Sequence, residues 1–164
     1  MMIVSLVVVV IVVLFAVFIF LSMKGPPRKL SDLKVPLDIL LKRGFECGTL
    51  IVDHKKSKKF VQFRKYIHKK GDYGVQLAFP NFEWSKEFIP NFKAQALKYG
   101  LVISEPSWSL DNKGAFLVID FVKDTDKAYQ FMRVIFLDVF SLSEDDIYYV
   151  SLNGVSVKDE LIDR

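Results

Sequence analysis

The chain has very few of the residues that build disulfide frameworks and metal centres. Its 164 residues include one cysteine, Cys47, and two histidines, His54 and His68. One cysteine cannot form an internal disulfide, and this is typical of proteins in a reducing compartment. A structural zinc site needs four ligands, at closer spacings than those between Cys47, His54 and His68. The sequence therefore predicts no bound metal, and no pattern in it points to any other cofactor.

Motifs that carry a known catalytic mechanism are also missing. The chain contains no glycine-rich phosphate loop, no Gly-x-Ser-x-Gly elbow, no Cys-x-x-Cys pair and no His-Glu-x-x-His motif. Glu144, Asp145 and Asp146 form a carboxylate cluster, but its position between a helix and a strand is typical of a solvated loop. The sequence thus predicts a protein without catalytic residues. An enzyme of unrecognised type is a further alternative.

Residues 1–23 lack charge, glycine and proline altogether. An apolar run of this length is enough to cross the roughly 30 Å hydrocarbon core of a bilayer as a helix. A cleaved signal peptide fits less well, because no basic residue precedes the run and no small residues mark a cleavage site. The basic residues that follow the run predict a single-pass protein of the plasma membrane or another cellular membrane. In this orientation the N-terminus is outside and the C-terminal domain is cytosolic.

The rest of the chain divides into a linker and one domain. Pro26 and Pro27 cannot continue a helix, and they begin a basic, proline-containing linker expected over residues 24–35. Residues 36–164 are enough for one cytosolic α+β domain with a hydrophobic core.

Charge is distributed unevenly within this part. Residues 24–100 contain 17 Lys and Arg against 7 Asp and Glu, whereas residues 101–164 contain 6 against 12. The densest basic clusters would be attracted to anionic lipid head groups or to nucleic acid. The alternative is that they are solvated turns between strands. The residues of the hypothetical anionic-surface contact are Lys55, Lys56, Lys58, Lys59, Lys69 and Lys70.

Hydrophobic periodicity and turn residues predict the secondary structure. One helix begins near Pro36 and ends at Gly44, a second runs from about Phe88 to Gly100, and a third spans residues 125–142. Strands are expected at residues 48–53, 60–67, 73–79, 101–108, 115–122 and 147–152.

From Tyr73 onward, the expected order is strand, helix, strand, strand, helix, strand. This βαββαβ order is the split βαβ pattern of ferredoxin-like domains, in which two helices cover one face of a four-stranded antiparallel sheet. The sequence therefore predicts an α+β, two-layer, ferredoxin-like domain. The strands at residues 48–53 and 60–67 would be extra N-terminal strands that extend or flank the sheet.

RNA-recognition-motif domains share this order, and residues 113–121 resemble their central-strand motif. Those domains bind single strands by stacking bases on aromatic side chains of the sheet. Here Ala115 replaces the first stacking aromatic residue and Asp120 replaces the last. A carboxylate at that position would repel phosphate, so the sequence disfavours nucleic-acid binding.

The third helix has more apolar residues than one buried stripe requires. Tyr129, Phe136 and Phe140 form an aromatic ridge beside that stripe. Either another helix or residues 37–41 cover the ridge, or part of it is exposed and anchors a partner. The sequence therefore predicts a membrane-anchored binding or scaffold module, a protein–protein interaction subunit or regulator on the cytosolic membrane face. An electrostatic reader of anionic lipid or nucleic acid is the alternative.

Overall fold

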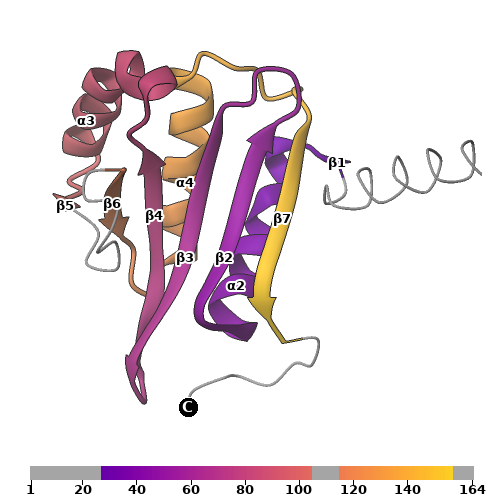
Figure 1. Ribbon diagram of the computed structural model, residues 1–164, viewed down its shortest axis with the longest axis vertical. Coiled ribbons are helices and arrows are strands. Elements are labelled where there is room, and N and C mark those ends of the chain that lie inside the picture. Colours follow the sequence, from indigo (N-terminus) through magenta and orange to yellow (C-terminus); the bar gives the residue numbers. More distant parts are fainter. Residues whose placement is uncertain (1–26, 105–114, 157–164) are drawn as a thin grey trace, which may run out of the picture.

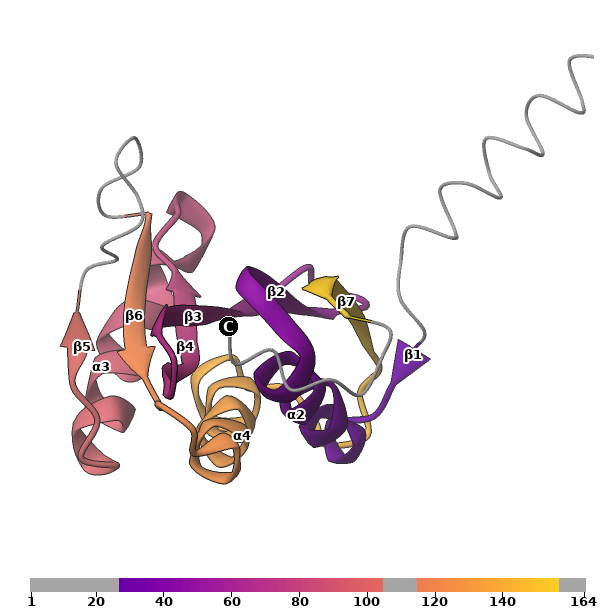
Figure 2. The ribbon, with the colours of Figure 1, turned by 90° about the horizontal axis from the view of Figure 1, so that it is seen from below.

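The computed structural model describes residues 27–104 and 115–156. In these residues, three α-helices pack on one face of a seven-stranded antiparallel sheet (Figures 1 and 2). The helices are α2 (Lys34–Arg43), α3 (Ile89–Lys98) and α4 (Thr125–Val134), and α4 continues into the short π-helix η3 (Ile135–Val139). The other face of the sheet carries no helix of the described residues.

The strand order across the sheet is β1-β7-β2-β3-β4-β6-β5, and every pair of neighbours is antiparallel. The strands are β1 (Pro27–Arg28), β2 (Gly44–His54), β3 (Phe60–Lys69), β4 (Asp72–Pro80), β5 (Ile103–Ser104), β6 (Phe116–Asp120) and β7 (Tyr148–Val155).

The predicted four-stranded ferredoxin-like arrangement is wrong, although the α+β class holds. In that arrangement the last strand would pair with β4, whereas β7 pairs with β2 and β1. The reason is the short turn between β3 and β4, which places β3 on the edge of β4 that the last strand would need. The β2–β3 hairpin consequently lies in the middle of the sheet rather than flanking it. Its side chains Leu50, Val52, Val61 and Phe63 are buried under the helices.

The predicted membrane topology is also corrected. Within residues 27–104 and 115–156, the structure contains no helix that is long and apolar enough to cross a bilayer. Each of the three α-helices has 10 residues, which corresponds to about 15 Å, half of the hydrocarbon thickness. A single-pass membrane location with a cytosolic domain is therefore not supported. The segment predicted to span the membrane, residues 1–23, lies outside the described residues.

Part of the expected linker belongs to the folded domain. Pro27 and Arg28 pair with β7 at the edge of the sheet. The next residues form the 3-10 helix η1 (Leu30–Leu33), and both of its leucines are buried in the core. Leucine at these two positions is sufficient to hold the segment against the sheet, since burial of each side chain contributes about 1.5–3 kcal/mol.

A polar contact joins the N-terminal ends of α2 and α4. The Thr125 hydroxyl donates to Asp38 at 2.5 Å, and the Lys34 ammonium lies 2.9 Å from the same carboxylate. Burial alone would raise the pKa of Asp38, but the hydrogen bonds from Thr125 and Lys34 and the charge of Lys34 hold that pKa below its usual value. The carboxylate therefore stays ionised at neutral pH and fixes the two helices relative to each other.

Candidate functional site

The lysines predicted to contact an anionic surface lie in two separate places. One group surrounds the β2–β3 turn and the other the β3–β4 turn, at opposite ends of β3 (Figure 1). The 10 residues of β3 separate them by about 33 Å. Lys59 is only partly exposed, because its ammonium donates to the Phe140 carbonyl at 3.0 Å and lies 4.5 Å from the centre of the Phe88 ring. Lys55, Lys56, Lys58, Lys69 and Lys70 are exposed, and their contact with an anionic surface stays a prediction.

The aromatic ridge is covered. Phe136 and Phe140 are 0% and 1% exposed. Tyr148 of β7 packs on Phe136 with 4.7 Å between ring centres. Tyr129 is partly buried, and its hydroxyl donates to the Leu30 carbonyl at 3.4 Å. The covering alternative therefore describes the ridge, although η1 and β7 contribute to the cover beyond the elements that were expected. Partner binding by Tyr129, Phe136 and Phe140 is untested, and the two phenylalanines present no surface for it.

His54 lies in an arrangement that sequence analysis missed. Its Nδ1 is 2.6 Å from Ser57 Oγ, and its Nε2 is 3.6 Å from Asp146 Oδ2. The three residue types are those of a Ser-His-Asp triad, but the ring nitrogens are exchanged, because in a triad Nε2 faces the serine and Nδ1 the aspartate. The Ser57 backbone N–H also donates to Nδ1, and Ser143 N–H donates to Asp146 and holds the pKa of that carboxyl below its usual value. We interpret the group as a clamp that ties the β2–β3 turn to the loop before β7.

The other candidate ligands do not assemble into a metal centre. Within the parts of the chain that the structure describes, no three His, Cys, Asp or Glu side chains are placed to hold a metal ion together. Cys47 is exposed at the start of β2, and the Arg64 guanidinium donates to its Sγ at 2.7 Å. His68 lies near the far end of β3, away from the His54 clamp.

The helix-free face of the sheet is polar, and its strongest groups pair with one another. The Tyr66 hydroxyl donates to Asp120 at 3.2 Å, from β3 across β4 to β6. Burial, with a contribution from the Asp120 charge, raises the pKa of Tyr66 to about 12. The tyrosine is therefore a neutral hydrogen-bond donor at physiological pH, and its hydroxyl is paired with Asp120.

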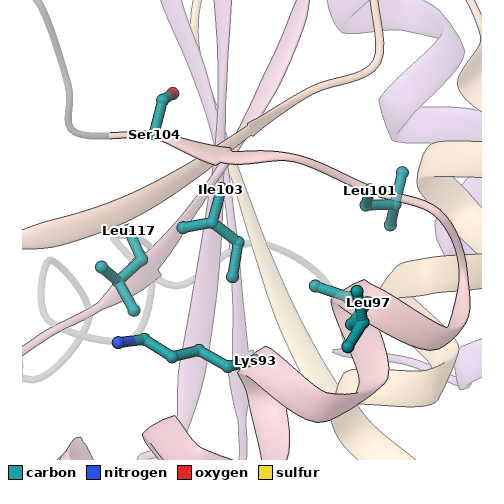
Figure 3. Close-up of a pocket in the computed structure, with 7 residues that line it drawn as sticks. Lys93, Leu97, Leu101, Ile103, Ser104 and Leu117 are labelled. Carbon is teal, nitrogen blue, oxygen red and sulfur yellow. The ribbon is translucent and has the colours of Figure 1, made fainter.

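A groove of about 420 Å³ lies at the opposite edge of the sheet from β1, between α3 and β5 (Figure 3). This volume falls within the range of peptide and small-molecule sites. Apolar side chains supply most of its walls. Its lining residues are Lys93, Ala96, Leu97, Leu101, Ile103, Ser104 and Leu117.

The groove follows from the way α3 ends. Gly100 has the left-handed φ of 64° that a helix C-terminus of the Schellman type requires. Its N–H donates to Leu97 O at 3.0 Å, and Leu101 N–H donates to Ala96 O at 2.9 Å. The chain therefore reverses at once, and Leu101 returns beside Ala96. The following residues form β5, which runs back along α3 with Ile103 opposite Ile119 of β6.

The groove borders an open strand edge with exposed apolar residues. Strand β5 is the last strand of the sheet, and on its outer side no strand of the described residues pairs with it. Leu97 is 81% exposed and Val102 is 82% exposed, the two highest values among the large apolar side chains of the described part. Proteins normally protect such edges with charge, proline or a covering element. An apolar edge that no strand of the described residues covers is therefore a surface on which another strand can add.

Sequence analysis did not find this site. The periodicity placed Phe88, Phe92, Ala96 and Tyr99 on one face of the second helix; Phe92 and Ala96 are buried, whereas Tyr99 is 40% exposed. Leu97 follows Ala96 in the sequence and lies outside that stripe. An apolar residue outside the buried stripe, three positions before Gly100, was the available signal. Whether it is exposed depends on the position of β5, which the helix pattern does not determine.

Comparison of the chain with protein-family models, with curated proteins and with solved structures finds no match. The function therefore has to be argued from the groove itself.

Proposed function

We propose that the protein is a protein-interaction module that binds an extended peptide segment in the groove between α3 and β5. The segment adds as a further strand to the outer edge of β5 and inserts an aliphatic side chain between Leu97, Leu101 and Ile103. This is the binding mode in which backbone hydrogen bonds provide affinity and a side-chain pocket provides selectivity.

One observation carries the proposal: an open strand edge and an apolar groove lie side by side. Either feature alone has a simpler explanation, since edge strands and shallow pockets are common. Together they match both requirements of an added strand. The exposed Val102 borders the edge, and Leu97 extends the apolar wall from the helix side.

The interaction is expected to be weak. Burial of one aliphatic side chain contributes about 1.5–3 kcal/mol to the binding free energy. The entropy lost when the extended peptide becomes ordered offsets part of this contribution and part of that from the backbone hydrogen bonds. Dissociation constants in the micromolar to millimolar range follow, which suits a regulator or an assembly subunit. The proposal keeps the protein partner that the sequence predicts.

Leu97→Asp tests the proposal. The probe is a blocked nine-residue peptide of serine and threonine with one leucine at position five, titrated into the full chain with its Leu and Ile methyl groups labelled for NMR. In the unaltered chain, we expect the methyl signals of Leu97, Leu101 and Ile103 to shift. Leu97→Asp should weaken binding by about tenfold, the equivalent of roughly 1.4 kcal/mol of lost apolar burial.

Val35→Asp is the matched control, because Val35 is also exposed but lies on α2, away from the groove. Both substitutions are on the surface and should change the free energy of unfolding by less than about 0.5 kcal/mol. Unchanged affinity in Leu97→Asp, or equal losses in both variants, would contradict the proposal. Absence of any methyl shift with the unaltered chain would contradict it as well.

A further inference from the structure

We infer that the preferred partner segment carries an acidic side chain two positions before the aliphatic residue that enters the groove. This inference rests on the proposed function, and it identifies the class of partner. The observation behind it is the position of Lys93. Lys93 is the one charged residue among the 7 that line the groove, and it is exposed on α3.

Figure 3 shows that the groove has a charged end and an apolar end. The Lys93 side chain extends toward Leu117 at one end, while Leu97 and Leu101 face each other at the other, with Ile103 between them. The two ends are separated by one turn of α3, from Lys93 to Leu97, or about 6 Å. Residues on the same face of a strand are two positions apart, or about 6.6 Å. A strand with its aliphatic residue beside Leu97 therefore presents its neighbouring groove-facing residue to Lys93.

The direction of the added strand determines whether the residue that faces Lys93 comes two positions before or two positions after the aliphatic residue. Every strand pair of the described sheet is antiparallel, and an antiparallel pair is slightly more stable per residue than a parallel one. Strand β5 runs from the Leu101 end of the groove toward the end at which the Lys93 ammonium and Leu117 lie. An antiparallel partner consequently enters at Lys93 and leaves at Leu101. Its acidic residue comes first, and its aliphatic residue follows two positions later.

Lys93 has the freedom to make this contact. Among the residues that the structure describes, it forms no ion pair, whereas Lys86, in the 3-10 helix η2 (Glu83–Phe88) before α3, pairs with Glu83 at 2.5 Å. An ammonium group at the mouth of an apolar groove favours a carboxylate and disfavours a second ammonium group. The contribution is modest because the site is open to water, so it selects among partners more than it creates affinity.

The test compares three blocked peptides that keep leucine at position five and carry threonine, glutamate or lysine at position three. With the full chain, the glutamate peptide should bind about two- to fivefold more tightly than the threonine peptide, and the lysine peptide more weakly. Lys93→Glu should reverse this order and leave the threonine peptide unaffected. The advantage of glutamate should also decrease as salt is added. A fourth peptide with glutamate at position seven should gain nothing, because that residue follows the leucine.

Lys98→Glu is the control, since it makes the same change of net charge on α3 outside the groove lining. It should keep the preference for glutamate at position three. Equal effects of Lys93→Glu and Lys98→Glu, or a greater gain from glutamate at position seven, would overturn the inference. Equal binding of all the peptides would overturn it while the proposed function stands, whereas failure of the threonine peptide to bind would contradict the proposed function itself.

Discussion

Phe136→Ala is expected to lower the free energy of unfolding by about 3–5 kcal/mol, the usual cost of deleting a buried phenylalanine. The ring of Phe136 is fully buried and packs between Tyr148 and Phe140, at 4.7 Å and 5.9 Å between ring centres. Tyr148 is held in β7 and Phe140 is itself buried, so the substitution is expected to leave a cavity. Chemical denaturation followed by circular dichroism measures the loss.

Leu97→Ala is the companion variant, because it also shortens an apolar side chain but at a site that is mostly exposed. It should change the free energy of unfolding by less than about 0.5 kcal/mol. A loss of less than 1 kcal/mol for Phe136→Ala would mean that the ridge is not part of the core. The hypothesis that Phe136 and Phe140 anchor a partner would then have to be taken up again.

Leu33→Ala should lower the free energy of unfolding by about 2–5 kcal/mol. Sequence analysis assigned this residue to a linker, whereas the structure buries it completely at the end of η1. A linker residue would tolerate alanine without loss of stability. Urea denaturation of Leu33→Ala and of Val35→Ala, an exposed neighbour, distinguishes the two descriptions. Similar midpoints for both variants would show that η1 does not contribute to the core.

The local elements could be predicted because each follows from nearby residues. Alternating apolar residues define β2 and β3, Gly44 follows the last residue of α2, and Gly100 closes α3. The end of the third helix was harder to predict from the sequence. It was expected to run to residue 142, but the α-helix gives way to a π-helix at Ile135, and Ser141 has a left-handed φ of 55°. We attribute the position of this helix end to the packing of Phe136 and Phe140 against other elements. The spacing of apolar residues along the helix carries no information about that packing.

The strand order could not be predicted from element order alone. The same sequence of strands and helices is compatible with β7 beside β4 or beside β2. Two features place β7 beside β2. The short β3–β4 turn puts β3 on one edge of β4, and the β2 residues Leu50 to His54 pair with β7. The β2–β7 pairs join residues about 100 positions apart, such as Leu50 and Leu152, and hydrophobic periodicity reports only on neighbours.

The candidate site shows the same limit. Sequence analysis proposed Tyr129, Phe136, Phe140 and the lysine clusters because aromatic and basic residues are conspicuous. The groove instead is lined mostly by ordinary aliphatic residues, which form a surface because β5 is the last strand of the described sheet. Exposure of Leu97 and Val102 is a property of the assembled fold.

The central claim, that a peptide strand adds to the edge of β5, is tested most directly by intermolecular nuclear Overhauser effects. The full chain is isotope-labelled and mixed with the unlabelled peptide that carries glutamate at position three and leucine at position five. We expect contacts from the peptide leucine methyl groups to Leu97, Leu101 and Ile103, and backbone contacts in antiparallel register along residues 102–104. Contacts confined to the helix-free face of the sheet, or to the His54 turn, would contradict the account.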